Sequence, residues 1–460
     1  MKLKKIAVFI CLIALSVQTV FAIQEVEIKK DSASYTNEVH SVFSLKDCID
    51  IAIANNPDIK ASIFNEEVYK SKIGQAWANY FPTISAGVEA SRSGTKYSHT
   101  KNLPFGYRSM YNTMGYVPNI SADMLLFDFG KTKAVADTAK NIYHAAQEDT
   151  KENINLIIYD IKSSYYNILF AQAQVKVYED TVKDYQLQLN QAKGFYKFGT
   201  KPKLDVVTAE YNLGKAKLNL IKAKNILEVA QVQLSKIMGI PEYTNYELSD
   251  ELILNNYDIT AEKAIKTAME VRPELIAAEK TAKAAKMNLR AARREFTPNL
   301  GIYGSYGNGI GNDYNMRSTQ VGLGLNYSAL NLMRTKKQIN QARAEYKRSQ
   351  ALLESVKDTV YLNVKKAYLD LETDKEAIVI AKLALDQAKE QYRQVTGRYK
   401  AGVGNAIELK DGENTYLNAR LDFYNSMLNY NVTAAKLEKE IGVPINTSED
   451  KVIKISAEEL

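Results

Sequence analysis

Few side chains of this 460-residue chain have the types and spacing that chemistry requires. Glu408 and Asp411 lie three residues apart, so on a helix the two carboxylates share one face and could attract cations. An ordinary solvated acidic pair is the alternative interpretation. The three histidines, His40, His99 and His144, are scattered and have no metal-ligand spacing. The sequence therefore predicts no metal site and no cofactor.

Catalytic motifs are equally scarce. The chain contains neither a nucleophile elbow nor a phosphate-binding loop. Gly307–Gly311 is rich in glycine, but it opens no predicted helix, and we interpret it as a surface loop between two strands. Apart from Cys11 in the N-terminal apolar run, Cys48 is the one cysteine, and it is predicted to be a buried thiol. We predict that the protein is not an enzyme; an envelope peptidase or glycosidase is the alternative that this absence disfavours.

The N-terminus indicates secretion. Residues 1–5 carry three lysines, residues 6–17 form an apolar run too short to span a bilayer, and Ala22 precedes the predicted cleavage site. Removal of this signal peptide lowers the formal charge from +7 to about +4. Acidic and basic residues alternate along the remaining chain, which is typical of solvated helix faces. No nucleic-acid partner is predicted.

The elements that must position these residues are encoded twice. Residues 44–59 match residues 260–275 at an offset of 216, and later the offset becomes 203. The second offset pairs Tyr196–Gly199 with Tyr399–Gly402 and residues 239–241 with residues 442–444. Two copies of one unit predict a fold with an approximate internal two-fold repeat.

Each unit contains a short helix, two strands and a long helical hairpin. The strands alternate apolar and small or polar residues over about 10 residues, which is typical of transmembrane strands, with a soluble hairpin as the alternative. From 130 to 198 and from 333 to 401 the chain lacks proline, which predicts helices of about 100 Å. Four strands cannot close a membrane barrel without unpaired edges, so strands from several chains must be combined.

In this order and duplication the chain resembles the TolC-type outer-membrane efflux protein family, the outer membrane factors. The motifs that carry the resemblance are Leu126-Phe127-Asp128, 196–199 with 204–206, 399–402 with 407–409, and the closing 239–241 and 442–444. The resemblance implies a mixed α+β membrane protein with four transmembrane β-strands and long coiled-coil-like helices per protomer, in two structural repeats. It further implies a homotrimer with a 12-stranded β-barrel on a 12-helix α-barrel.

The predicted domain boundaries follow from the repeats and the resemblance. They are a signal peptide at 1–22, an N-terminal extension at 23–43, repeat 1 at 44–241, an inter-repeat equatorial segment at 242–259, repeat 2 at 260–444 and a C-terminal tail at 445–460. The strands are expected at about 82–92 and 119–128 and at about 298–307 and 318–328, and the helical tips at about 199–204 and 402–407.

Function and partners are also implied by the resemblance. It implies an outer-membrane channel whose helical barrel extends into the periplasm and which passively conducts substrates out of the cell. The implied partners are two further copies of the chain, outer-membrane lipid, a periplasmic adaptor (membrane fusion) protein, and an inner-membrane efflux pump or the ABC-type exporter of a type I secretion system. A periplasmic coiled-coil scaffold or adaptor-like protein without a pore is the alternative.

The resemblance assigns roles to individual residues at the helical tips. Glu408 and Asp411 would form the pore constriction, the periplasmic gate, while Asp205 and Tyr399 would hydrogen-bond neighbouring helices and hold the gate closed. The tip residues implied to contact the adaptor are Gly199, Thr200, Lys201, Gly402, Val403 and Gly404. The family pattern has an arginine at the position of Gly404, so part of the expected closed-state salt bridge is missing here.

Overall fold

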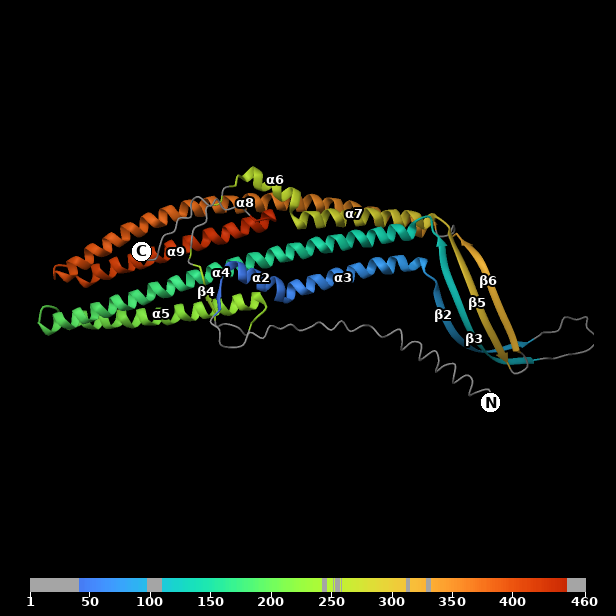
Figure 1. Ribbon diagram of the computed structural model, residues 1–460, viewed down its shortest axis with the longest axis horizontal. Helices are drawn as coiled ribbons and strands as arrows, with labels where there is room; N and C mark the ends of the chain where they lie inside the picture. The colour runs from blue at the N-terminus through green and yellow to red at the C-terminus, as the bar shows by residue number, and fades with distance from the viewer. Residues whose placement is uncertain are drawn as a thin grey trace, which may run out of the picture. The chain divides into compact units, whose positions relative to one another are not determined.

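The computed structural model describes residues 41–444, apart from 97–109, 242–245, 251, 253–256, 258, 312–314 and 328–331. The predicted signal peptide, the predicted C-terminal tail and nearly all of the predicted N-terminal extension lie outside these residues. The elements, shown in Figure 1, are β1 Ser41–Phe43, α2 Leu45–Asn55, α3 Pro57–Trp77, β2 Thr83–Lys96, β3 Met110–Phe127, α4 Lys131–Lys197, α5 Lys203–Met238, β4 Tyr246–Leu248, α6 Ala261–Val271, α7 Pro273–Arg293, β5 Asn299–Gly311, β6 Asn315–Asn326, α8 Leu332–Lys400 and α9 Ala406–Ile441.

Two long helical hairpins form most of the structure. Helices α4 and α8 contain 67 and 69 residues, so each is about 100 Å long. Each runs from the end of a strand to a tight turn, after which a 36-residue helix, α5 or α9, returns alongside it. Helices α3 and α7 pack on the strand-proximal part of α4, and α7 also packs on α8 (Figure 1). Helix α4 contacts α9 as well, which joins the two repeats.

The sheet has the order β2-β3-β5-β6, with every neighbouring pair antiparallel. One row across all four strands is polar or small, joining Ser85, Ser121, Ser305 and Gln320. The adjacent row, on the opposite face, joins Ile84, Ala122, Gly304 and Val321. Ile84 and Val321 are 73% and 76% exposed, so no part of the chain that the structure describes covers this apolar face. Strands β2 and β6 each leave one edge without a partner among the described strands.

The two hairpins of the sheet have the same register. Thr83 pairs with Asp123 in the first hairpin, and Asn299 pairs with Asn326 in the second. These positions are related by the sequence offsets of 216 and 203, so the duplication seen in the sequence extends to individual strand pairs. The strands are longer than the alternating pattern predicts, because β2 continues to Lys96 and β3 begins at Met110.

Equivalent side-chain contacts connect helices at the same position in each repeat. In repeat 1 the buried Asn56 caps α3 and donates its side-chain amide to the carbonyl of Ile237, at 2.8 Å. In repeat 2 the equivalent position is Arg272, which donates to the carbonyl of Glu440 at 3.2 Å and to its carboxylate at 2.6 Å. In repeat 1 an amide thus joins the start of α3 to the end of α5. In repeat 2 a guanidinium joins the start of α7 to the end of α9 at the equivalent position.

Asp128 forms the transition from strand β3 to helix α4. Its buried carboxylate accepts hydrogen bonds from the Tyr80 hydroxyl at 2.7 Å and from the backbone N–H groups of Gly130 and Thr132 at 2.9 and 2.6 Å. Burial favours a higher pKa for Asp128, but the hydrogen bonds from Thr132, Tyr80 and Gly130 outweigh it and lower the pKa. The charged carboxylate therefore satisfies the first backbone donors of α4.

Two apolar clusters hold the helices together near the middle of the hairpins. One lies between α8, α9 and α6 and includes Val360, Phe423 and Leu437; the other lies between α4, α5 and α2 and includes Ile161, Tyr165 and Met238. Cys48 lies in the second cluster, as predicted, and burial raises its pKa to about 12. Among the residues that the structure describes, no helix is both long and apolar enough to cross a membrane.

Candidate functional site at the helical turns

The two turns that end the long helices have the same backbone geometry. Gly199 and Gly402 adopt positive φ values of 70° and 77°, which glycine tolerates without a side-chain clash. After the first glycine, the N–H of Thr200 donates to the carbonyl of Phe195 at 3.0 Å; after the second, the N–H of Val403 donates to the carbonyl of Arg398 at 3.1 Å. Both helices therefore end in the glycine cap that the sequence predicts.

Direct contacts join the two turns. The Lys201 ammonium lies 3.4 Å from the carbonyl oxygen of Gly404 and 5.7 Å from the centre of the Tyr399 ring. The Phe195 ring meets the Tyr399 ring edge-on, with centroids 6.1 Å apart. A Cβ atom at Gly404 would approach the backbone N of Tyr399 to 2.8 Å, so this backbone has no room for the arginine of the family pattern. Lysine and aromatic contacts occupy this place instead.

The proposed gate-closing pair is close but is not hydrogen-bonded within the chain. Tyr399 is buried and Asp205 is half-buried. Burial, and secondarily the negative charge of Asp205, raise the pKa of Tyr399. Among the described residues, neither the Tyr399 hydroxyl nor the Asp205 carboxylate has a hydrogen-bond partner.

The two proposed constriction residues differ in their surroundings. The backbone N–H of Glu408 donates to the Asn405 side chain at 2.7 Å, and its carboxylate lies 3.7 Å from the Arg398 guanidinium. Asp411 is exposed, and its carboxylate has no ion-pair partner among the described residues. Of the two, Asp411 is the carboxylate that remains available to ions, while Glu408 lies in the first turn of α9 beside the cap.

A buried polar cluster lies just above the turns, and the sequence analysis missed it. Glu413 is 4% exposed and accepts a hydrogen bond from Gln188 on α4 at 3.0 Å. Burial, and to a smaller extent the negative charge of Asp184, raise the pKa of Glu413 to about 7, although the hydrogen bond from Gln188 lowers it. The residue follows Leu409 and precedes Tyr416 at helical spacing, so its position on the packed face of α9 could have been recognised.

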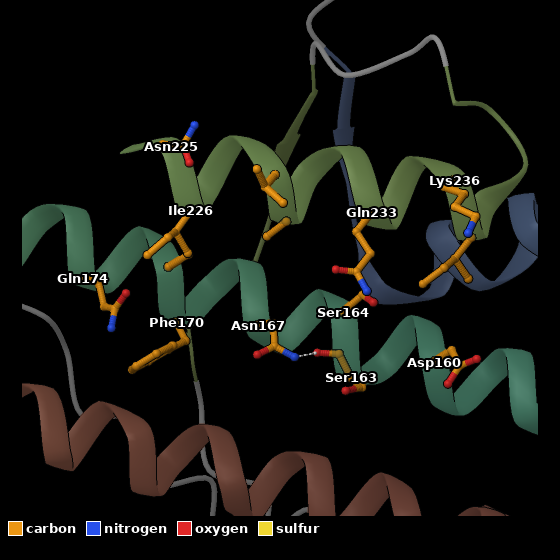
Figure 2. Close-up of a pocket in the computed structure, with 14 residues that line it drawn as sticks. Asp160, Ser163, Ser164, Asn167, Phe170, Gln174, Asn225, Ile226, Gln233 and Lys236 are labelled. Atoms are coloured by element: carbon orange, nitrogen blue, oxygen red, sulfur yellow. Dashed lines mark hydrogen bonds between the residues drawn. The ribbon is translucent and has the colours of Figure 1, made fainter. Parts of the chain in front are cut away.

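A groove lies far from the turns, between α4 and α5. This groove has a volume of about 760 Å³, and Figure 2 shows its polar side chains on both helices, with Asn167 bonded to the carbonyl of Ser163. Asp160 and Lys236 are the charged residues of the lining. Within the described part of the chain, no group of three or more histidine, cysteine or carboxylate side chains could hold a metal ion.

Comparison with known proteins agrees with this architecture. The Outer membrane efflux protein family matches residues 48–240 and 264–443. The chain is 20% identical over 404 residues to the probable efflux pump outer membrane protein TtgC of Pseudomonas putida, covering 87% of this chain and 83% of that protein.

Two solved structures have the same fold. The Campylobacter jejuni CmeC outer membrane channel superposes with a TM-score of 0.74 at 17% identity, covering 88% of this chain and 87% of that one. The open state of the Neisseria gonorrhoeae MtrE outer membrane channel gives a TM-score of 0.70 at 21% identity, with coverage of 87% and 89%. With both repeats matched by the family, this chain belongs to the outer membrane efflux protein family.

Proposed function

We propose that three copies of this chain form an outer-membrane channel with a periplasmic helical duct, through which substrates leave the cell passively. The observation that carries the proposal is the four-stranded sheet with one apolar face, one polar face and two unpaired edges. In lipid each unpaired backbone group costs several kcal/mol, so the edges of β2 and β6 need partners from other copies. Three copies supply twelve strands, with the polar face lining the lumen.

The helices support the same assembly. Helix α5 exposes an apolar series at helical spacing, and α8 exposes a second one. The α5 members are Leu204, Val207, Tyr211, Leu218 and Ile221. Packed against neighbouring copies, four helical rods per chain would give a 12-helix barrel about 100 Å long that reaches into the periplasm.

The channel would be the outer component of a tripartite system. The similar Pseudomonas putida protein is named as part of an efflux pump, and this supports a periplasmic adaptor protein and an inner-membrane pump as partners. An ABC-type exporter of a type I secretion system is the other inner-membrane partner that such a duct serves. The adaptor would contact the turns through Gly199, Thr200, Lys201, Gly402, Val403 and Gly404.

Gating would occur at the same turns. Asp411, with Glu408 beside it, would form a ring of carboxylates when three copies meet, and such a ring attracts cations and impedes anions. Asp205 and Tyr399 would close the gate by bonding across chains, since neither side chain has a hydrogen-bond partner among the residues that the structure describes. The proposed domains are the signal peptide 1–22, extension 23–43, repeats 44–241 and 260–444 joined by 242–259, and the tail 445–460.

Single-channel conductance in a planar bilayer tests the channel and the gate together. Wild-type protein extracted in detergent is expected to give a small, cation-selective conductance. Asp411→Ala should reduce the cation selectivity several-fold, because it removes the available carboxylate. Glu408→Ala should have a smaller effect, because that carboxylate already faces Arg398 at 3.7 Å. If neither substitution alters the selectivity of the pore, the channel proposal stands but Glu408 and Asp411 do not form its gate.

A further inference from the structure

The ends of the two helical hairpins carry apolar side chains that none of the described residues covers. Phe198 is 81% exposed and Val403 is 74% exposed, and Ile407 is exposed to a similar degree. The contact between Lys201 and Gly404 brings the two turns into one surface, which we call the tip patch: residues 197–205 and 398–411. A soluble protein seldom leaves such a cluster uncovered unless it binds a partner.

Basic residues predominate in the tip patch. It contains six basic and three acidic side chains: Lys197, Lys201, Lys203, Arg398, Lys400 and Lys410 against Asp205, Glu408 and Asp411. Arg398 and Glu408 face each other, and Lys201 is directed to a backbone carbonyl. Lys197, Lys203 and Lys400 are exposed, and each lacks an ion-pair partner among the residues that the structure describes.

From this distribution we infer that the tip patch binds a protein whose contact surface has an apolar centre and an acidic rim. The inference rests on the proposed function and adds the chemistry of the partner at the adaptor-contacting turns. Complementary charge around an apolar contact selects partners and accelerates their encounter. Three copies of the chain would present three such patches around the mouth of the duct, so several weak contacts would act together.

A protein fits the tip patch better than an anionic lipid surface does. Helices α4 and α8, each about 100 Å long, separate the tip patch from the four-stranded sheet that is proposed to contact lipid (Figure 1). A folded partner can place carboxylates opposite the exposed lysines and an apolar surface opposite Phe198 and Val403. The patch also includes two turns of similar geometry, with φ of 70° at Gly199 and 77° at Gly402, so the partner would meet a repeated backbone shape as well as a charge pattern.

Two designed helical hairpins provide the probe. Both have the same apolar turn, one flanked by three glutamates and the other by three lysines. The full-length channel in nanodiscs should bind the acidic hairpin at least about tenfold more tightly than the basic one at about 0.05 M salt, with the preference shrinking at about 0.5 M. Lys197→Glu, Lys203→Glu and Lys400→Glu together should invert the preference.

The control has the same change in charge at a different place. Lys46→Glu, Lys60→Glu and Lys70→Glu together alter exposed lysines on α2 and α3 and should retain the wild-type preference. Three outcomes would overturn the inference: the channel binds neither hairpin, it prefers the basic one, or it binds phosphatidylglycerol vesicles through the tip patch instead. Wild-type conductance, measured on the same preparation, separates this outcome from failure of the channel proposal itself.

Discussion

At the scale of single residues, the buried carboxylate of Glu413 makes the stability of the packing between the two helical hairpins depend on pH. Its pKa in the folded protein is about 7, against an ordinary value of 4.5, chiefly because burial disfavours the charged form. Facing it are Asp184 and Tyr185 on α4 and Tyr392 on α8. Because the folded pKa is raised, the stability that this group contributes is complete below about pH 4.5. It is lost as the pH rises through 7.

Replacing Glu413 by glutamine should therefore flatten the pH profile of stability. The amide keeps an oxygen that can accept the hydrogen bond from Gln188, but it carries no charge at any pH. Between about pH 5 and about pH 9 the free energy of unfolding of the wild type should decrease. This decrease should exceed that of Glu413→Gln by on the order of 3 kcal/mol. Thermal unfolding of the detergent-extracted protein, followed by circular dichroism, measures this difference.

A matched variant distinguishes burial from the simple loss of a carboxylate. Glu67→Gln makes the same chemical change at an exposed position of α3 and should retain the wild-type profile. Identical profiles for wild type and Glu413→Gln would show that the carboxylate is not held in a dry site.

At the scale of elements, the glycines that end α5 and α9 are equivalent in sequence but not in space. Both have positive φ, 76° at Gly239 and 87° at Gly442. A Cβ at Gly239 would approach the backbone of Asn55 to 2.8 Å, whereas a Cβ at Gly442 would find its nearest neighbour at 3.4 Å. The end of α5 therefore packs more closely on the junction of α2 and α3 than the end of α9 packs on the junction of α6 and α7.

Alanine substitutions should reveal this difference. Gly239→Ala should lower the free energy of unfolding by about 2 kcal/mol or more, because backbone strain and a steric clash add together. Gly442→Ala should cost about 1 kcal/mol, the strain alone. Gly194→Ala, in the last turn of α4 where a Cβ would meet no atom within 4 Å, should instead be neutral or stabilising by up to about 1 kcal/mol. Thermal unfolding checks the order, and equal losses at Gly239 and Gly442 would contradict it.

The elements also show how much the sequence can predict. The duplication and its two offsets correctly predicted the paired strands, the long helices and their glycine turns. The strand ends were predicted less well, because backbone pairing continues through Arg92–Lys96, where the apolar alternation has stopped. The register irregularity between Leu125 and Phe127 likewise leaves no sequence signal.

The candidate site was predictable only in part. Residue spacing placed Glu408 and Asp411 on one helix and the turns at the helix ends. The ion pair with Arg398, the contact of Lys201 with Gly404 and the burial of Glu413 depend on how the two hairpins pack, and periodicity within one helix does not report that packing. Arg272 shows the same limit, because its buried partner Glu440 lies 168 residues away.

At the scale of the whole molecule, the account requires that β6 of one copy pairs with β2 of the next. The internal repeat predicts the register of this pairing. Within the chain Ala122 of β3 pairs with Gly304 of β5. Applying the offsets of 203 and 216 to these residues places Leu325 of one copy opposite Val88 of its neighbour. Paired strands bring opposite Cα atoms to about 4.5–5.5 Å, within the range that a disulfide spans.

The measurement that tests this claim most directly is disulfide crosslinking of the Val88→Cys, Leu325→Cys double variant in outer membranes. Cys48 is buried and stays in place as an unreactive thiol. On a non-reducing denaturing gel the account predicts crosslinked dimers and trimers and nothing larger. The control pair Val88→Cys, Gly324→Cys, with side chains on opposite faces, should give none. Absence of crosslinks from the first pair, or their appearance in the control alone, would contradict the shared sheet on which the channel depends.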